Sequence, residues 1–222
     1  IPLNRRTISR RRFVAMGVAL PLTTLGATSR PFTPRQTEGP FYPNRRQDDR
    51  DADLTRVDGK SGRAKGELIE VYGQVLAGDL RPIPGAVVDV WQANTYGRYA
   101  HEADPNRAPI DENFQGWAVL KTDARGFYRF TTIMPGAYPV SARWTRPPHI
   151  HFKVSKPGFS SLTTQMYFAG HPLNESDGLL HQHAEAEREK LIVDFSRPVS
   201  SNAESDIKRG VFNIILGPGR SA

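Results

Sequence analysis

The stretch Trp144-Thr-Arg-Pro-Pro-His-Ile-His-Phe152 decides how this sequence folds. Side chains on a β-strand alternate between its two faces, so a strand here places His149 and His151 on the same side. Ile150 and Phe152 then point the other way, into a core. Two imidazoles in front of an apolar face form half of a metal site. The alternative for an isolated His-x-His pair is a chance occurrence on a solvated strand, so the rest of the chain has to decide.

Short strand-like segments separated by turn signals recur along the body of the chain. The expected strands run over 67–76, 85–91, 127–133, 149–155, 163–168 and 211–216. Turn signals include 77–82, 122–126 and 135–139. This pattern predicts an all-β fold, a β-sandwich of mostly antiparallel strands. One short C-terminal helix is expected over 183–191, where Ala, Glu, Arg and Lys cluster.

The chain has 222 residues, of which 38% are hydrophobic, and this is enough for one domain with a substantial core. We expect a leader over 1–29, an irregular N-terminal arm over 30–65 and a β-sandwich domain over 66–222. The chain has no cysteine, which excludes disulfides, thiolate metal ligands and cysteine nucleophiles. Any metal must therefore bind to His, Tyr, Asp or Glu, and such ligands favour the harder metals.

The positive charge of the chain is concentrated at its N-terminus. Of the formal net charge of +7, five arginines among the first dozen residues account for all but +2. They are Arg5, Arg6, Arg10, Arg11 and Arg12. The rest of the chain is nearly balanced and has no basic stripe interleaved with aromatic residues, so we expect no nucleic-acid binding.

The same segment carries a targeting pattern. Ser9-Arg-Arg-Arg-Phe-Val14 is followed by a short apolar run and then by small residues up to Ser29. This order is typical of a twin-arginine export signal, so we expect a periplasmic or extracellular protein cleaved near Ala27. The apolar run is too short to span a bilayer, so no stable membrane insertion is expected. The alternative is a basic disordered tail or an uncleaved anchor.

Two tyrosines join the histidine pair as potential metal ligands. Tyr99 and Tyr138 lie between the second expected strand and the pair His149 and His151. Ionising a phenol at neutral pH costs roughly 4 kcal/mol, and only a strong Lewis acid such as a ferric ion compensates for two such ionisations. Zinc usually takes His, Cys or carboxylate ligands. Two phenols and two imidazoles therefore suit a hard, highly charged ion.

Six short blocks, read in order, resemble the intradiol ring-cleavage dioxygenases, and the resemblance is closest to the iron-carrying β-subunit type of protocatechuate 3,4-dioxygenase. It runs from about Thr37 to about Pro172. The blocks are Thr37-Glu-Gly-Pro-Phe-Tyr-Pro43, Asp89-Val-Trp-Gln-Ala-Asn94, Gly97-Arg-Tyr99, Pro135-Gly-Ala-Tyr-Pro139, Arg146-Pro-Pro-His-Ile-His-Phe152 and Gln165-Met-Tyr-Phe168. Each block alone is weak to moderate, whereas their order and spacing are specific.

The resemblance implies a non-haem Fe(3+) held by four side chains and one solvent molecule. The side chains are Tyr99, Tyr138, His149 and His151. It also implies that Tyr138 leaves the iron when substrate binds and takes a substrate proton, whereas Tyr99 stays bound.

Four other residues match substrate-facing positions of the family. Arg146 matches the arginine that faces the bound catecholate and stabilises charge developing on its ring, and Gln165 matches its partner. Trp91 matches a pocket-lining aromatic residue, with a core tryptophan on a strand as the alternative. Tyr42 is expected at the mouth of the site. The remaining histidines are expected at the surface: His101, His171, His181 and His183.

The implied reaction uses O2 to cleave a catechol ring between its two hydroxyl-bearing carbons, giving a cis,cis-muconate. Protocatechuate, giving 3-carboxy-cis,cis-muconate, is the expected substrate, because the short arm before Thr37 lacks the helical segment of the other branches. Catechol, hydroxyquinol or a bulkier plant-derived catechol are the alternatives. Family members of this type pair two related chains, so we expect a homo-oligomer or a related partner subunit. The alternative of a different class is a transthyretin-like β-sandwich interaction module, which does not need both tyrosines, the histidine pair and Arg146.

Overall fold

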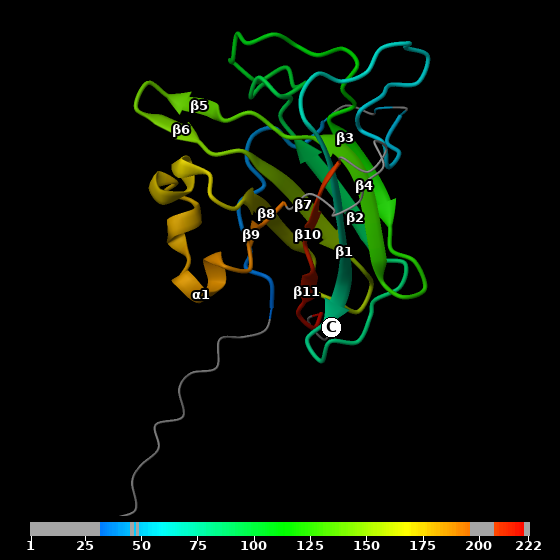
Figure 1. The fold of residues 1–222 in the computed structure, drawn as a ribbon. Helices are drawn as coiled ribbons and strands as arrows, with labels where there is room; N and C mark the ends of the chain where they lie inside the picture. The colour runs from blue at the N-terminus through cyan, green and yellow to red at the C-terminus, as the bar shows by residue number, and fades with distance from the viewer. Residues whose placement is uncertain (1–31, 45–46, 48, 196–206, 220–222) are drawn as a thin grey trace, which may run out of the picture.

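Two β-sheets form the body of the protein in the computed structural model of the chain (Figure 1). The structure describes residues 32–44, 47, 49–195 and 207–219. The leader expected over 1–29, including the cleavage site near Ala27, lies outside the described residues.

The first sheet contains the His-x-His strand and has the order β3-β2-β7-β8-β9. The strands are β2 (Val87–Gln92), β3 (Trp117–Lys121), β7 (His149–Ser155), β8 (Leu162–Phe168) and β9 (Ile192–Val193). Neighbouring strands pair antiparallel, except that β9 runs parallel to β8. Because β7 is the central strand, hydrogen-bonded partners on both sides fix the register of its side chains.

The second sheet is built around β1 (Leu68–Ala77). β4 (Phe127–Ile133) pairs antiparallel with it, whereas β10 (Lys208–Val211) and β11 (Ile214–Leu216) pair parallel with it in one continuous register. The prediction of a single closing strand over 211–216 is therefore wrong, because two short strands lie there. The ladder is interrupted at Asn213, whose side-chain Oδ1 accepts a hydrogen bond from the Gln74 backbone N–H at 2.9 Å.

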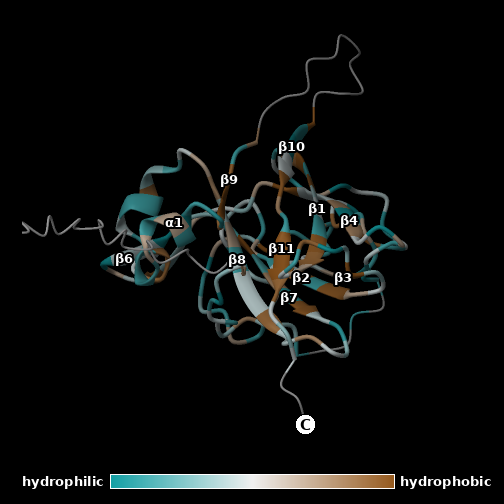
Figure 2. Ribbon diagram, turned by 90° about the horizontal axis from the view of Figure 1, so that it is seen from below, coloured by the Kyte–Doolittle hydropathy of each residue, from teal (hydrophilic) through white to brown (hydrophobic). Residues whose placement is uncertain are grey.

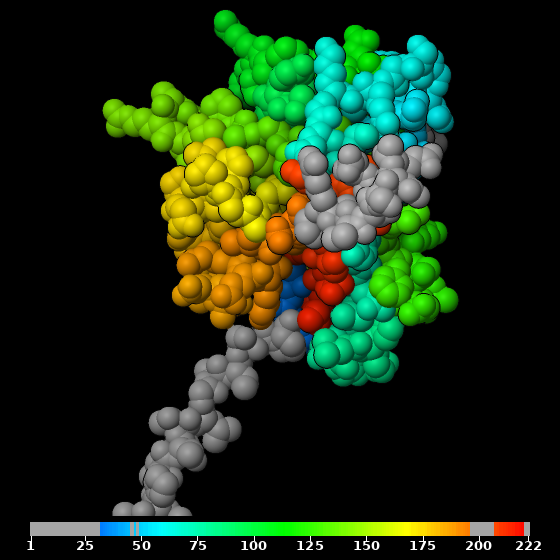
Figure 3. Space-filling model, in the orientation of Figure 1, coloured from blue at the N-terminus to red at the C-terminus, as the bar shows by residue number. Residues whose placement is uncertain are grey.

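A hairpin projects from this body and lies near a helical segment. It consists of β5 (Tyr138–Ser141) and β6 (Trp144–Arg146), so the turn expected over 135–139 leads directly into a strand. Figure 3 shows the hairpin, in light green, extending beyond the rest of the molecule. The helical segment that follows β8 contains two 3-10 turns and one α-helix: η1 (Pro172–Ser176), η2 (Leu180–Gln182) and α1 (Glu185–Arg188).

The helix expected over 183–191 is shorter than the composition predicts. Only Glu185–Arg188 is helical, and none of its residues is buried. A helix without an apolar face gains little from packing, and single turns are marginal on their own. Among the described residues, no helix has the length and apolar character needed to cross a membrane.

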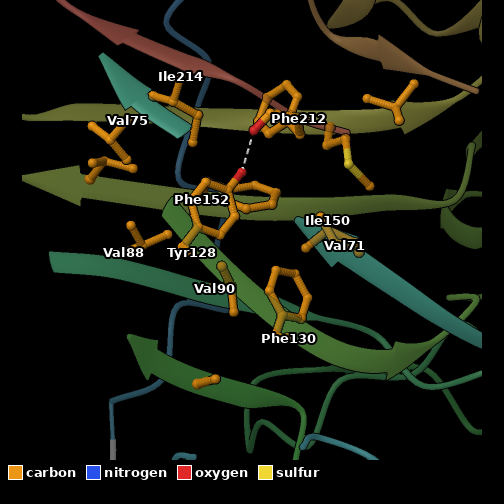
Figure 4. Packing of buried hydrophobic residues seen from close by; sticks show 14 of the residues in the cluster. Val71, Val75, Val88, Val90, Tyr128, Phe130, Ile150, Phe152, Phe212 and Ile214 are labelled. Atoms are coloured by element: carbon orange, nitrogen blue, oxygen red, sulfur yellow. Dashed lines mark hydrogen bonds between the residues drawn. The ribbon is translucent and has the colours of Figure 1, made fainter. Parts of the chain in front are cut away.

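The core lies between the inner faces of the two sheets. Figure 2 shows hydrophobic segments of β2, β7 and β11 gathered at the centre, with the hydrophilic α1 at the outside. Ile150 and Phe152 are fully buried in this core, so the alternation predicted along β7 is confirmed. Figure 4 shows Tyr128 of β4 donating a hydrogen bond across the core to the backbone oxygen of Phe212, at 2.5 Å.

The N-terminal arm is attached to β8 along its length. The Gln36 N–H donates to the Thr163 carbonyl at 2.8 Å, and the Thr164 hydroxyl donates to the Pro34 carbonyl at 2.7 Å. Further along, the Gln165 side-chain amide donates to the Thr37 carbonyl at 2.8 Å. These bonds hold the arm beside β8 and bring Thr37 to Gln165, on the face of the sheet that carries His151.

Candidate active site

The outer face of the first sheet carries a row of side chains from three neighbouring strands. Trp91 of β2 pairs with His151 of β7, and His151 pairs with Gln165 of β8. His149 lies further along β7, opposite Tyr167 of β8. Since the alternate residues of β7 fill the core, both imidazoles lie on this outer face.

Two glycines bring the two tyrosine-bearing loops together. Gly97 has a φ of 74°, and a Cβ on it would lie only 2.1 Å from the Ala137 carbonyl oxygen. A Cβ on Gly136 would lie 2.4 Å from the Gly97 nitrogen. Each glycine stands two residues before its tyrosine, so this close backbone contact places Tyr99 and Tyr138 side by side. Their ring centroids are 5.8 Å apart, with an interplanar angle of 89°.

Two buried polar residues hold the loop that carries Tyr99. The Asn94 Oδ1 accepts hydrogen bonds from the backbone N–H groups of Tyr96 and Arg98, at 2.9 and 3.1 Å. The Asp104 Oδ2 accepts one from the Tyr99 N–H at 2.7 Å. The sequence did not identify these supporting residues, although Asn94 ends one of the six blocks and could have drawn attention there.

Three donor atoms of the predicted ligands form a triangle. The Nε2 atoms of His149 and His151 are 3.1 Å apart, and the Tyr99 hydroxyl lies 3.3 and 3.1 Å from them, respectively. Tyr138 completes the group, with its ring centroid 5.9 Å from that of His149. The structure therefore brings all four residues together from the loop after β2, the start of β5 and β7.

The triangle has the dimensions of a metal-binding site. Two ligands bound at about 2.1 Å and separated by about 90–110° lie about 3.0–3.4 Å apart. His149 Nδ1 is 2.7 Å from the Pro147 carbonyl oxygen, which can only accept, so this nitrogen carries the hydrogen and Nε2 keeps its lone pair. Among the described residues, no group of three or more His, Cys, Asp or Glu side chains could hold a metal. A metal at this face therefore needs the tyrosines.

Burial sets the protonation of the four side chains. Burial, with a contribution from nearby Arg146, holds the pKa of His149 and of His151 well below the usual value for histidine. Both imidazoles are therefore neutral at physiological pH. Burial also raises the pKa of Tyr99 well above its usual value and raises the pKa of Tyr138, although Arg146 opposes these shifts. Ionising the phenols thus requires a strongly charged cation at the triangle.

Arg146 lies beside the triangle and is 2% exposed. Its Nη1 donates to the Gln165 Oε1 at 2.9 Å and lies 3.3 Å from the His149 Nε2. Its Nη2 donates to the Tyr167 hydroxyl at 2.7 Å. The Asp177 carboxylate binds the opposite edge of the guanidinium, at 3.1 Å from Nε and 2.8 Å from Nη2. The sequence did not identify Tyr167, although it lies in the Gln-Met-Tyr-Phe block, or Asp177, for which it carried no signal.

A cavity of about 200 Å³ opens next to Tyr138, Arg146 and His151. The arm forms one wall of this cavity, and the β5–β6 hairpin and the loop before η2 form the others. The other lining residues are Thr37, Gly39, Pro40, Phe41, Val140, Trp144 and Leu179. A small planar ligand placed there would contact Tyr138 and Arg146 together.

Trp91 and Tyr42 lie away from this cavity. The Trp91 ring stacks on His151, with centroids 4.7 Å apart and planes at 10°, and it lines a separate cavity of about 230 Å³ that also touches Tyr99. Tyr42 packs edge-on against Trp91, and its hydroxyl donates to Asp89 at 2.7 Å. Trp91 therefore supports a predicted ligand, and Tyr42 supports Trp91. Their expected contact with substrate stays a prediction.

The four other histidines do not join the triangle. Each is partly or largely exposed. His101 lines the 230 Å³ cavity, whereas His171, His181 and His183 belong to the segment around η1 and η2. His183 lies 3.4 Å from Glu187, in a pair at the surface.

The chain is similar to proteins of one enzyme family over most of its length. A family model described as dioxygenase matches residues 37–218. The chain is 44% identical over 176 residues to the protocatechuate 3,4-dioxygenase beta chain of Burkholderia cepacia, covering 78% of this chain and 73% of that one. It is 37% identical over 179 residues to catechol 1,2-dioxygenase 1 of Acinetobacter lwoffii, covering 72% of this chain and 52% of that one.

A solved structure agrees with these matches. It is the dioxygenase domain of a dioxygenase–carbohydrate-binding protein fusion from Streptomyces sp. SirexAA-E, with a TM-score of 0.61 and 29% identity over 85% of this chain and 99% of that one. The all-β fold agrees with this neighbour. The chain belongs to the intradiol ring-cleavage dioxygenases.

Proposed function

We propose that this chain uses Fe(3+) and O2 to cleave protocatechuate between its two hydroxyl-bearing carbons, giving 3-carboxy-cis,cis-muconate. The observation that carries the proposal is the triangle of Tyr99, His149 and His151 donor atoms, 3.1–3.3 Å apart, beside the buried Arg146. The 44% identity to a protocatechuate 3,4-dioxygenase beta chain supports this substrate.

The donor set fits a ferric ion. Tyr99, Tyr138, His149 and His151 would hold it through two phenolate oxygens and two neutral imidazole nitrogens. When bound, the ion supplies the Lewis acidity and redox activity that make a chelated catecholate reactive toward O2. The two imidazoles are already neutral, so only the phenols have to lose protons when it binds.

The two tyrosines have different surroundings. The Tyr99 hydroxyl contacts both imidazole nitrogens, whereas Tyr138 borders the 200 Å³ cavity. A catechol in this cavity would contact Tyr138, whereas Tyr99 does not line it. The Tyr138 phenolate oxygen is therefore placed to accept a proton from a substrate hydroxyl, acting as general base.

Arg146 supplies a fixed positive charge at the cavity wall. Its guanidinium does not lose its proton at any physiological pH, so it stabilises negative charge that develops on the substrate ring. Gln165 is fully buried and accepts a hydrogen bond from Nη1, which fixes the orientation of that charge.

The cavity wall supports a second class of substrate. Pro40, Val140, Trp144 and Leu179 present mostly apolar surface to the cavity, and Arg146 there is already paired with Asp177. Such a wall favours a catechol with a neutral ring substituent over one with a carboxylate, because an unpaired buried charge is costly. Catechol, hydroxyquinol and bulkier plant-derived catechols are therefore the alternatives to test beside protocatechuate.

Product analysis tests the reaction and the substrate together. Iron-loaded protein is supplied with ¹⁸O2 and, in separate reactions, with protocatechuate, catechol, hydroxyquinol and 4-methylcatechol. The proposal expects a muconate product that carries label from O2, with protocatechuate showing the highest kcat/KM. A higher kcat/KM for 4-methylcatechol than for protocatechuate would show that the preferred substrate is a catechol with a neutral ring substituent. Absence of ring cleavage with all four would overturn the proposed function and favour an interaction module.

We also propose export through the twin-arginine signal, and self-association or pairing with a related subunit. The Ser9–Val14 motif supports the first, and the name of the Burkholderia cepacia beta chain supports the second. Cell fractionation of the wild type against the R10K/R11K variant tests export, because the variant should stay in the cytoplasm. Analytical ultracentrifugation of the purified chain tests self-association.

A further inference from the structure

Arg146 is held from one side by a carboxylate that comes from a distant part of the chain. Asp177 lies between η1 and η2, is fully buried and binds the guanidinium through both of its oxygens. Two parallel N–H···O bonds to a carboxylate fix the plane of a guanidinium as well as its position. Asp177 therefore determines both the location and the rotation of the Arg146 side chain.

Asp177 is itself fixed by its own loop. Its Oδ2 accepts a hydrogen bond from the Leu180 N–H at 3.3 Å, and its backbone carbonyl accepts one from the His181 N–H at 3.0 Å. The Asn174 side chain ties the start of this loop to the Phe168 carbonyl at the end of β8, at 2.8 Å. The carboxylate is thus attached to the sheet that carries the site.

The pairing leaves one nitrogen of the guanidinium for the site. Nε and Nη2 face Asp177, and Nη2 also donates to Tyr167. Nη1 is directed to Gln165 and to the His149 Nε2, where the predicted ligands converge. We propose that Asp177 is a positioning residue for ring cleavage, which aims Nη1 of Arg146 at the bound catecholate. This inference rests on the proposed function.

Asp177 also balances a buried charge. The side chains of the pair are 3% and 0% exposed, so water does little to screen either ion. The carboxylate offsets the guanidinium charge, so Arg146 can stay buried in one orientation beside the neutral imidazoles. Gln165 and Tyr167 offer only neutral oxygens and cannot supply this balance.

The first test is the D177N variant, whose side chain is nearly the same shape but binds the guanidinium with one oxygen. The proposal expects kcat to fall on the order of 100-fold, because misplacing a reactive group by about 1 Å costs that much. Anaerobic affinity for protocatechuate and iron content should change by less than about threefold, since the ligands remain. The control is D79N, which breaks the exposed Asp79–Arg81 pair and should leave all three values unchanged.

The second test does not depend on iron or on turnover. The R146A variant leaves the Asp177 carboxylate facing an empty space shaped for a guanidinium. Millimolar guanidinium should then raise the Tm of metal-free R146A, because a ligand that binds only the folded state stabilises it. The R146A/D177N double variant should show no such rise, and neither should wild-type protein. An equal concentration of sodium chloride controls for ionic strength.

The outcomes separate the inference from the proposed function. If guanidinium stabilises R146A but the wild type cleaves no catechol, the Asp177 anchor is real but the proposed function is wrong, and the positioning role falls with it. If the wild type is active and D177N keeps its full kcat, Gln165 and Tyr167 suffice and the inference is overturned. A D177N protein that does not fold would make Asp177 a stability determinant, which also overturns it.

Discussion

His149 and His151 place their Nε2 atoms 3.1 Å apart on the same face of β7. His149 keeps its Nε2 lone pair because its Nδ1 hydrogen goes to the Pro147 carbonyl. Burial holds the pKa of both imidazoles well below the usual value, so neither readily takes up a proton that the two nitrogens could share. A metal cation is the natural group to lie between two such nitrogens and the Tyr99 oxygen.

Replacing Gly97 with Ala should separate the two tyrosine loops. The new Cβ would meet the Ala137 carbonyl oxygen at 2.1 Å, and the residue would keep a φ of 74°. We expect a loss of about 2–5 kcal/mol in the free energy of unfolding, combining left-handed backbone strain and overpacking, together with weaker iron binding. Urea unfolding and iron titration measure the two effects.

Gly59 provides the matched control for that substitution. It has a φ of 77° and nothing within 4 Å of an added Cβ. G59A should therefore cost only the backbone strain, about 1–2 kcal/mol, and leave iron binding intact. Equal losses in both variants would show that the contact between the tyrosine loops does not matter.

The two tyrosines predicted as ligands should respond differently to loss of the hydroxyl. Y99F removes the oxygen that contacts both imidazole nitrogens, so we expect the larger loss of iron affinity. Y138F removes the proton acceptor at the cavity, so we expect most iron to be retained while kcat falls about 10²–10⁴-fold. Iron content after dialysis and steady-state kinetics measure these effects. The reverse order would exchange the roles assigned to the two phenols.

Metal-free protein should lose stability on acidification through the histidine pair. Burial lowers the folded-state pKa of His149 and of His151 below the ordinary value of 6.5. Near and below pH 6.5 the histidines of the unfolded chain bind protons that the folded chain does not bind. The free energy of unfolding therefore decreases as the pH is lowered. Well above pH 6.5 neither state binds these protons, so the pair contributes no slope. Urea unfolding from pH 7.5 to 5.5 should show this loss, and the H149N/H151N variant should show a shallower one.

The hydroxyl of Tyr128 should matter for stability and not for the site. It donates to the Phe212 carbonyl inside the core, on the opposite side of the first sheet from the triangle. Y128F leaves that carbonyl without this donor, so we expect a loss of about 1–3 kcal/mol with iron affinity unchanged. Y96F, at a side chain that is 40% exposed, should stay within about 0.5 kcal/mol of wild type. Thermal and urea unfolding of both variants decide the comparison.

Local sequence pattern was enough for the strands that alternate. β7 and β4 have the predicted bounds, and β7 places its residues on the predicted faces. β3 was missed because Trp117 and Ala118 are both buried on opposite faces, which hides the alternation. The two-residue β9 is too short for any periodic signal.

The candidate site was also predicted only in part from the sequence. Sequence motifs were enough to name Tyr99, Tyr138, His149, His151 and Arg146, which the structure brings together. Asp177 could not be found, because its contact with Arg146 joins residues 31 positions apart, with β7, β8 and η1 between them. Such a contact depends on how η1 and η2 pack against the sheet, and no local pattern encodes it.

The visible absorption spectrum of iron-loaded protein, before and after anaerobic addition of protocatechuate, tests the central claim most directly. Two tyrosinates on a ferric ion should give a charge-transfer band, and chelation by a catecholate should shift it. A coloured protein whose band moves on addition of substrate is the predicted result. A protein that stays colourless with stoichiometric iron would contradict the ferric site built from Tyr99, Tyr138, His149 and His151.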